Sequence, residues 1–284
     1  MSTIQPADVD AWRAYVGREE TVSQYLDAVS LARFLAVLGE SVDADTGTVP
    51  EMAHWAYFLP MTANDDIGPD GHVRRGGFMP PVTLPRRMFA GGSTSFHRPL
   101  RVADEATCRT RIADVTHKAG RSGDLVFVEL ERTFSQAGDT CAVEKQTIVY
   151  RDAGGSVAPV GRTDPAALEE PVWTPGPVHL FRFSAVTFNA HRIHYDEPYA
   201  KAEEGYPGLV VHGPLTASML CRLAARAAAG RRMSGFSFRA MAPLFADQPI
   251  RLRATREEEK VEAVALRQDG QIAVAASATL APQS

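Results

Sequence analysis

Residues 91–104 read GGSTSFHRPLRVAD and residues 234–247 read SGFSFRAMAPLFAD, so one pattern occurs twice in the chain. A second match sets residues 138–148 against residues 270–280, and both members of this pair open on glycine. A repeated order of this kind predicts an internal duplication. The alternative is two unrelated domains that share a few turn residues by chance, and the paired matches favour duplication.

The repeated unit combines a helix with an antiparallel sheet. Apolar runs separated by Gly-rich turns predict strands in both halves. The predicted strands are 93–96, 107–115, 125–134 and 141–150 in the first half and 235–238, 250–256, 261–266 and 272–280 in the second. Apolar residues at helical spacing predict one or two helices within 8–40 and one helix from about Pro214 to Ala229. The fold class is therefore α+β.

A segment rich in Gly and Pro divides the chain nearly in half. We interpret residues 152–176 as a linker, which leaves an N-terminal unit of residues 1–151 and a C-terminal unit of residues 177–284. Within the first unit, residues 61–81 read MTANDDIGPDGHVRRGGFMPP, which predicts a long loop. Loops of this length are often functional.

Composition excludes several classes of protein. With 45% hydrophobic and 23% charged residues, the 284-residue chain has the composition of a folded globular protein. A formal net charge of -4 and scattered basic residues speak against a nucleic-acid partner. The apolar runs are too short for a membrane span and the start is polar and acidic, so we expect a cytoplasmic protein with no membrane partner. Cys108, Cys141 and Cys221 are widely spaced and odd in number, which predicts reduced packing residues.

Polar residues are unusually dense in residues 181–200, FRFSAVTFNAHRIHYDEPYA. One short stretch holds an amide, two imidazoles, a guanidinium, a phenol and a carboxylate, on Asn189, His191, Arg192, His194, Tyr195 and Asp196. A lone histidine here would be best explained as a satisfied core side chain beside a solvated loop. Two histidines together with asparagine and arginine favour a functional site.

A second motif follows in residues 208–230, GLVVHGPLTASMLCRLAARAAAG. Gly213 as N-cap with Pro214 at the first helical position suits a helix start, because proline lacks the amide hydrogen that would be unpaired there. The free amides and positive dipole end of such a start can hold a carbonyl oxygen that gains negative charge. Taken alone, the motif also fits an ordinary core helix that buries Leu215 and Leu220.

Together the two motifs resemble the MaoC-like, type 2 enoyl-CoA hydratase family, which has the hot-dog fold. That family carries a pattern like D-x-N-P-x-H, followed by a His-Gly that opens the central helix. Here Asn189 and His194 have the same separation as the Asp and His of the D-x-N-P-x-H pattern, and His212-Gly213 follows one residue later than the His-Gly of the family. The resemblance implies that His194 is the catalytic histidine and that the Gly213 amide binds a thioester carbonyl. Asn189 stands where the family has its catalytic aspartate.

The resemblance is closer to the two-hot-dog subgroup, which includes hydratases of mesaconyl-C4-CoA and itaconyl-CoA and the type 2 mitochondrial hydroxyacyl-thioester dehydratase. It runs through LPRRMFAGG (84–92), FHRPLRVAD (96–104) and FSAVTFNAHRIHYD (183–196), and covers about nine tenths of the chain. It implies a double hot-dog: two long helices, each wrapped by an antiparallel sheet, fused in one chain. In that subgroup asparagine also occupies the position of Asn189. We expect the C-terminal unit to be catalytic and the N-terminal unit to be non-catalytic and pocket-forming.

Asparagine leaves the proton chemistry open, because an amide can orient water but cannot accept a proton at ordinary pH. Our preferred hypothesis is that His194 alone is the acid/base and Asn189 positions water. Alternatively, His191 or Asp196 is a second proton carrier, or the unit is catalytically altered. In the preferred mechanism His194 removes a proton from the water that attacks the β carbon, or acts in reverse, while the Gly213 amide stabilises the enolate.

Three arginines and two histidines are candidates for substrate binding. Arg86, Arg87 and Arg192 could bind CoA phosphates or a free carboxylate on the acyl group. Surface salt bridges would explain Arg86 equally well. We expect His191 and His212 to contact the substrate. The H-x-x-H spacing in the motif offers too few ligands for a metal, so we expect neither a metal nor a cofactor besides the coenzyme A of the substrate.

The predicted activity is that of a lyase, namely hydration of an enoyl-CoA or dehydration of a 3-hydroxyacyl-CoA. The resemblance implies a branched C5 dicarboxylic acyl group, as in mesaconyl-C4-CoA or itaconyl-CoA, with citramalyl-CoA as product. The alternatives are dehydration of straight-chain 3-hydroxyacyl thioesters and, in another class, a non-catalytic acyl-CoA-binding scaffold. Thioester hydrolysis is disfavoured because residues 214–230 contain no Asp or Glu. The direction, the stereochemistry and homo-oligomer formation stay open.

Overall fold

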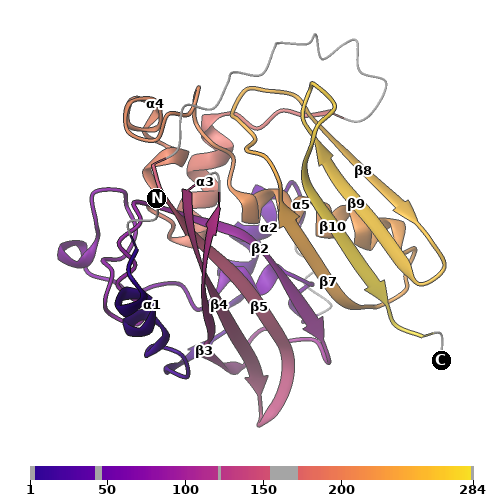
Figure 1. Ribbon diagram of the computed structural model, residues 1–284. Coiled ribbons are helices and arrows are strands. Elements are labelled where there is room, and N and C mark those ends of the chain that lie inside the picture. Colours follow the sequence, from indigo (N-terminus) through magenta and orange to yellow (C-terminus); the bar gives the residue numbers. More distant parts are fainter. Residues whose placement is uncertain (1–3, 42–46, 121–122, 154–171, 283–284) are drawn as a thin grey trace.

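The computed structural model describes residues 4–41, 47–120, 123–153 and 172–282. Their strands form one antiparallel sheet in the order β1-β3-β4-β5-β2-β7-β10-β9-β8-β6 (Figure 1). The first five strands of this order come from the N-terminal half of the chain and the last five from the C-terminal half. The two halves therefore meet edge to edge, where β2 pairs with β7.

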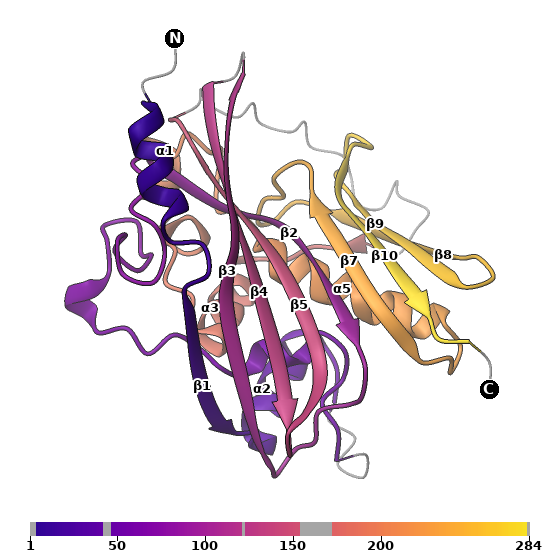
Figure 2. The ribbon, with the colours of Figure 1, turned by 60° about the horizontal axis from the view of Figure 1, so that its bottom comes forward.

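The N-terminal unit contributes the longer strands, which Figure 2 shows side by side with β1 at the edge. Its strands are β1 (Glu19–Tyr25), β2 (Arg86–Phe96), β3 (Glu105–Gly120), β4 (Gly123–Gln136) and β5 (Asp139–Arg151). Its helices are α1 (Pro6–Arg13), α2 (Ala28–Val37) and the short 3-10 helices η1 (Ala53–Ala56) and η2 (Asn64–Asp66).

The C-terminal unit repeats this order with shorter strands and a longer helix. Its strands are β6 (Val172–Trp173), β7 (Met233–Ala240), β8 (Ile250–Arg256), β9 (Lys260–Leu266) and β10 (Ile272–Leu280). Its helices are α3 (Pro177–Thr187), the 3-10 helix η4 (Arg192–His194), α4 (Glu197–Ala202) and α5 (Gly213–Ala227).

The predicted duplication is confirmed by the sheet topology. The order β1-β3-β4-β5-β2 in the first unit corresponds strand for strand to β6-β8-β9-β10-β7 in the second. The sequence-matched stretches supply β2 and β7, which pair antiparallel with Ser93 opposite Ser237 at the centre of the register. The hairpin glycines also correspond, since Gly138 and Gly270 both adopt a positive φ, 84° and 83°.

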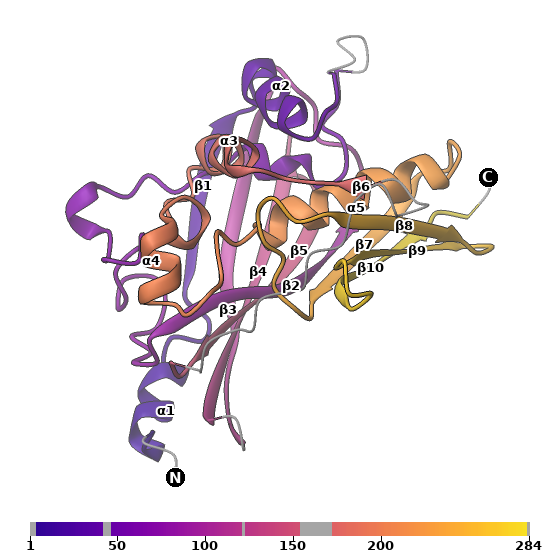
Figure 3. The same ribbon diagram turned by 90° about the horizontal axis from the view of Figure 1, so that it is seen from above.

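Helices cover one face of the sheet, and Figure 3 shows α2, α3 and α5 together on that side. Helix α5 packs across the strands of its own unit through a face that includes Leu215, Leu220 and Ala224, all buried. Helices α2 and α3 pack against each other, with the rings of Phe34 and Phe183 5.9 Å apart between centroids. The hydrophobic core thus runs continuously through both units.

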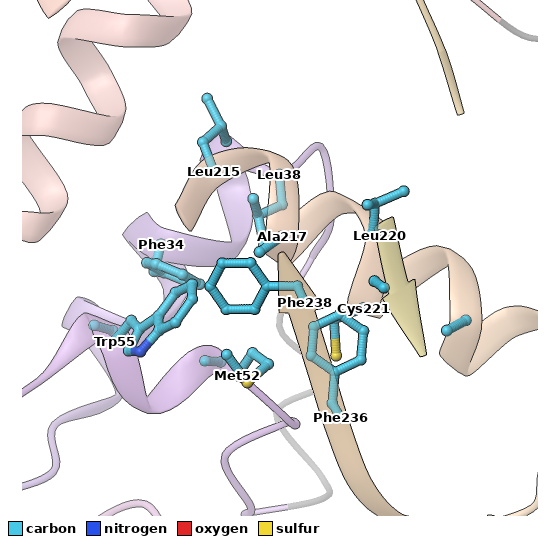
Figure 4. Close-up of a cluster of buried hydrophobic side chains, with 14 of the residues drawn as sticks. Phe34, Leu38, Met52, Trp55, Leu215, Ala217, Leu220, Cys221, Phe236 and Phe238 are labelled. Carbon is cyan, nitrogen blue, oxygen red and sulfur yellow. The ribbon is translucent and has the colours of Figure 1, made fainter. Parts of the chain in front are cut away.

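Aromatic side chains fill the core where the two units join (Figure 4). Trp55 of η1 meets Phe238 of β7 nearly edge to face, with centroids 6.0 Å apart. The indole Nε1 of Trp55 donates a hydrogen bond of 2.7 Å to Oε1 of the buried Glu144. This bond satisfies the polar end of a side chain whose apolar body is removed from water.

The helices of the N-terminal unit are shorter than we expected. Helix α5 has 15 residues, whereas α2 has 10 and η1 only 4. Strand β1 also falls within residues 8–40, where only helices were predicted. It is an edge strand, and most of its side chains are exposed, so it lacks the apolar alternation that marks a half-buried strand.

Two predicted boundaries need correction. The N-cap of α5 is His212, with extended backbone angles, and Gly213 is the first helical residue. The predicted linker ends too late, because Val172 pairs with Arg251 and so belongs to the second unit. Residues 154–171 of that linker lie outside the described residues.

The three cysteines are free thiols in the core, as predicted. Burial raises the pKa of the Cys108, Cys141 and Cys221 thiols, which disfavours the nucleophilic thiolate. None of the described helices combines the length and the apolar character needed to cross a membrane.

Candidate active site

The first turn of α5 forms one side of the site. The amide hydrogens of the first turn of a helix have no acceptor within the helix, and the positive end of the dipole lies there. A Cβ built on Gly213 would lie 3.8 Å from the carbonyl oxygen of Phe89 on β2, which is ordinary contact. Packing against β2 therefore does not require glycine at 213, and the amide of Gly213, as part of the first turn, has no acceptor within the helix.

His194 lies beside this turn with one ring nitrogen available. Its Nδ1 lies 2.7 Å from the carbonyl oxygen of Val210, and because a carbonyl only accepts, Nδ1 carries the hydrogen. The lone pair of the neutral ring is then on Nε2. Burial, and after it the proximity of His212 and His191, holds the pKa of His194 well below its usual value. His194 is thus a neutral base at pH 7.

His212 supports the ring of His194 from beneath. The two imidazoles stack with centroids 3.6 Å apart and an interplanar angle of 20°. Nε2 of His212 lies 2.9 Å from Oγ of Ser184 on α3. Burial lowers the pKa of His212 to about 3, so the stack carries no charge at neutral pH. His212 therefore fixes the orientation of His194.

Asn189 shapes the turn that follows α3. Its Oδ1 accepts a hydrogen bond of 3.0 Å from the amide of His191. The preceding residue, Phe188, has a left-handed backbone with a φ of 49°, which ends the helix. One lone pair of the amide oxygen is thus used locally. The predicted water-positioning role of Asn189 stays a prediction.

Arg192 and Asp196 are bound to each other and to neighbouring segments. Nη2 of Arg192 lies 2.7 Å from Oδ2 of Asp196, and Nη1 donates to the carbonyl of Pro69 at 3.0 Å. The guanidinium also lies 4.0 Å from the ring centroid of Tyr199, and Asp196 caps α4. These contacts join the motif to the long loop of the first unit. Substrate contact by Arg192 stays a prediction.

Arg86 is buried and not part of a surface salt bridge. Its Nε lies 3.5 Å from Oε2 of Glu204, whose Oε1 lies 3.9 Å from Nε2 of His191. Nη1 of Arg86 is buried without a hydrogen-bond partner in the described part of the chain. Arg87 lies near Tyr150, 6.0 Å from its ring centroid. Arg86 is thereby connected to the histidines of the motif.

The structure adds two site residues that the motifs did not reveal, Asp70 and His72 on the long loop. Gly71 between them has a φ of 88°, and a Cβ there would lie 1.7 Å from the carbonyl oxygen of Ala190. The amide of Arg192 donates to the carbonyl of Asp70 at 3.0 Å. Only glycine permits this close approach, so the loop of the first unit docks onto the motif of the second.

His72 lies over His191 in this docked loop. Its Nδ1 lies 3.0 Å from Oδ2 of Asp70, and its ring centroid is 4.0 Å from that of His191. Burial lowers the pKa of His72 to about 4, against the opposing effect of Asp70. The hydrogen bond to His72 helps to hold the pKa of Asp70 below its usual value although burial opposes it.

Four imidazoles therefore form one row from the start of α5 to the loop. The centroid separations along the row are 3.6 Å from His212 to His194, 5.4 Å from His194 to His191 and 4.0 Å from His191 to His72. No group of three or more His, Cys, Asp and Glu side chains in the described ranges has the geometry to hold a metal ion. The row brings imidazoles of both units together at the start of α5.

The fold and site define a class, the double hot-dog proteins. A solved MaoC-like dehydratase from Phytophthora capsici superposes with a TM-score of 0.69 at 16% identity, covering 97% of this chain and 98% of that one. Rv0216 of Mycobacterium tuberculosis, described as having a double hot-dog fold, superposes with a TM-score of 0.51 at 12% identity over 94% of this chain and 96% of that one.

Sequence comparison narrows the class to a family. The family model for hydroxyacyl-thioester dehydratase type 2 matches residues 52–246. The chain is also 45% identical over 279 residues to mesaconyl-C(4)-CoA hydratase of Chloroflexus aurantiacus, covering 95% of this chain and 98% of the relative. The chain belongs to the hydroxyacyl-thioester dehydratase type 2 family.

Proposed function

We propose that this protein catalyses the reversible hydration of an enoyl-CoA, the activity of a hydro-lyase. The observation that carries the proposal is the position of a neutral His194 beside the open amide of Gly213. Enolate formation needs a donor at the thioester oxygen, and proton transfer needs a base with a free lone pair nearby. The membership in a family of dehydratases supports the same reaction.

Each group has a defined task in this reaction. The amide of Gly213 donates to the thioester oxygen as negative charge develops on it. His194 transfers a proton through Nε2, while Val210 and His212 hold its tautomer and its ring plane. Asn189 orients water. No cofactor takes part, since the coenzyme A belongs to the substrate.

For the acyl group we propose a branched C5 dicarboxylic chain of the mesaconyl or itaconyl type, hydrated to citramalyl-CoA. The relative named mesaconyl-C(4)-CoA hydratase supports this choice. The buried Arg86 supports it too, because Nη1 of its guanidinium has no hydrogen-bond partner among the described residues and suits a free carboxylate. Arg87, Arg192 and His191 complete the proposed substrate-binding set. A straight-chain 3-hydroxyacyl thioester is the second candidate, favoured by the family model.

The N-terminal unit, residues 1–151, is proposed to form the pocket, and the C-terminal unit to carry His194. Helix α5 contains no Asp or Glu, which disfavours thioester hydrolysis, as the sequence indicated. We further propose a cytoplasmic location and, from the net charge of -4 and the scattered basic residues, no nucleic-acid partner.

The test is an assay of enoyl absorbance with mesaconyl-CoA and crotonyl-CoA as substrates. We expect the parent to hydrate the dicarboxylic substrate faster. His194→Ala should lower kcat by about 10²-fold to 10⁴-fold, the usual contribution of a general acid/base. Equal activity of parent and variant would refute the mechanism. A parent that binds CoA tightly without hydrating either substrate would support the scaffold hypothesis instead.

A further inference from the structure

Arg86 and Arg151 lie directly opposite each other at one end of the sheet, where β2 pairs antiparallel with β5. Directly opposite residues of an antiparallel pair point to the same face, with Cβ atoms about 4.5 to 5.5 Å apart. Two like charges in this arrangement repel each other and destabilise the strand pair. A chain that keeps two guanidiniums side by side therefore needs anions to compensate them.

The described residues supply this arginine pair with one carboxylate. Oε2 of Glu204 lies 3.5 Å from Nε of Arg86, and the side chains of Glu204 and Arg86 are only 12% and 8% exposed. Arg151 makes no ion pair within the described part of the chain. Two cations thus face one anion, and one positive charge is left uncompensated.

Both guanidiniums also hold a buried N–H group that has no hydrogen-bond partner among the described residues. These groups are Nη1 of Arg86 and Nε of Arg151, and leaving a buried donor of a charged group unpaired is costly. Tyr206 lies beside them, since burial raises the pKa of its hydroxyl while Arg151 and Arg86 oppose this shift. Arg151 is also a hydrogen-bond partner of Tyr206 and can only donate, so the hydroxyl hydrogen of Tyr206 is free for an anion.

This end of the sheet adjoins the candidate active site. Oε1 of Glu204 lies 3.9 Å from Nε2 of His191, whose ring centroid is 5.4 Å from that of His194. Phe89, whose carbonyl oxygen is 3.8 Å from a Cβ built on Gly213, follows Arg86 by three residues of β2, a rise of about 10 Å. The uncompensated charge is therefore a short distance from the groups that act on the thioester in the proposed reaction.

We propose that Arg151, together with Arg86 and Tyr206, binds the free carboxylate of a dicarboxylic acyl group and determines the specificity for such a group. The inference rests on the proposed hydratase function and names the residues that select its substrate class. A carboxylate carries one negative charge, which balances the one uncompensated charge of the arginine pair. The 3′-phosphate of CoA carries up to two and would leave the site negative.

Stability without substrate tests whether Arg151 is kept for binding or for the fold. Arg151→Met keeps an unbranched apolar stem and removes the charge, while Arg86 stays paired with Glu204. Because repulsion between opposite cations is lost, the urea concentration at the midpoint of unfolding should be equal to or higher than that of the parent. A lower midpoint would assign Arg151 to the fold, and the proposal would be wrong.

Binding is measured by calorimetry in the His194→Ala background, which avoids turnover, with mesaconyl-C4-CoA and crotonyl-CoA as probes. Both probes carry CoA, and only the first has a free carboxylate. Adding Arg151→Met should weaken binding of mesaconyl-C4-CoA by about 10-fold to 100-fold and leave that of crotonyl-CoA within about 3-fold. Arg151→Lys should recover part of the loss, because it keeps the charge but not the planar donor group.

Arg267→Met is the matched control. Arg267 also has a buried Nε without a partner in the described residues, but its Nη2 lies 2.9 Å from Oδ2 of Asp269, so its charge is already compensated. This variant should change neither binding constant. Equal weakening of both probes by Arg151→Met would place the shared CoA at Arg151 and overturn the proposal, as would unchanged binding of mesaconyl-C4-CoA.

Failure of the proposed function is a separate result. It would appear as no hydration of either enoyl-CoA by the parent, whereas the difference between the two probes is measured without turnover. If the His194→Ala protein binds neither probe, the inferred carboxylate site is wrong as well.

Discussion

Replacing Gly71 by alanine tests whether the long loop of the first unit docks onto the second as described. Alanine at a φ of 88° is strained by about 1 to 2 kcal/mol. In addition, its Cβ would meet the carbonyl oxygen of Ala190 at 1.7 Å, and because both atoms belong to rigid segments, no rotamer relieves the clash. The loop must move away.

Displacement of the loop breaks two hydrogen bonds, from the amide of Arg192 to Asp70 and from its Nη1 to Pro69, each 3.0 Å long. Such bonds contribute about 1 to 2 kcal/mol each. We expect Gly71→Ala to displace the loop and to reduce the free energy of unfolding by about 3 to 6 kcal/mol, the sum of the backbone strain and the two lost hydrogen bonds. If the displaced loop also relieves the backbone strain, only the hydrogen-bond part of about 2 to 4 kcal/mol remains.

Gly138→Ala in the β4–β5 hairpin is the matched control. Its φ is 84°, but no atom lies within 4 Å of the added Cβ, so only the backbone strain applies. Urea unfolding at pH 7 and the rate of hydration are measured for both variants. Gly71→Ala should lower kcat by at least about 10²-fold, and Gly138→Ala should not change it. Equal stability and equal activity of the two variants would refute the docking.

Three further predictions concern the supporting contacts. Ser184→Ala removes the hydroxyl that contacts Nε2 of His212, so it should lower the free energy of unfolding in urea by about 1 to 3 kcal/mol and should also lower kcat. Ser218→Ala is the control and should be nearly neutral, because the buried hydroxyl of Ser218 is unpaired in the described residues. His212 has a pKa of about 3 in the folded state against about 6.5 unfolded, so the unfolded chain binds this proton more readily and the contribution of His212 to stability, complete above pH 6.5, falls by about 2 kcal/mol at pH 5. His212→Phe should therefore lose about 2 kcal/mol less than the parent between pH 7 and pH 5, and equal losses in the two proteins would contradict this. Arg86→Leu leaves Glu204 buried without its cation and should lower the free energy of unfolding by about 3 to 5 kcal/mol. The double variant Arg86→Leu with Glu204→Leu should recover most of that loss. Additive losses in the double-mutant cycle would show that the two side chains are not coupled.

The sequence predicted well those parts of the fold that are formed by residues close together in the chain. Strands β8 and β10 have the bounds that were expected, because their apolar residues lie between clear turn residues. His194 lies beside the start of α5, because its ring stacks on His212, the residue before Gly213. Edge strand β1 was not predicted, because its side chains are mostly exposed and do not alternate between apolar and polar residues.

Contacts between distant segments could not be predicted in the same way. The sequence marked residues 61–81 as a functional loop, but nothing local to it indicates that Asp70 and His72 reach residue 191. The signal that could have found them is Gly71, since a glycine between two polar residues often marks a close backbone approach. Arg192, which the motif marked for substrate, also binds Asp196 and the carbonyl of Pro69, and its contact with substrate stays a prediction.

The two units share one scaffold and differ in the polar groups that it holds. Residues 33–37 on α2 read RFLAV, and residues 182–186 on α3 read RFSAV, and the two phenylalanines meet between the helices. At the position that differs, Leu35 is buried in the core while Ser184 contacts His212. Ser184 therefore gives the second unit a polar contact for its histidine stack that Leu35 does not give the first. The first unit instead supplies the loop with Asp70 and His72, which docks onto residues 190–192 of the second, so residues from both copies of the duplicated unit form the site.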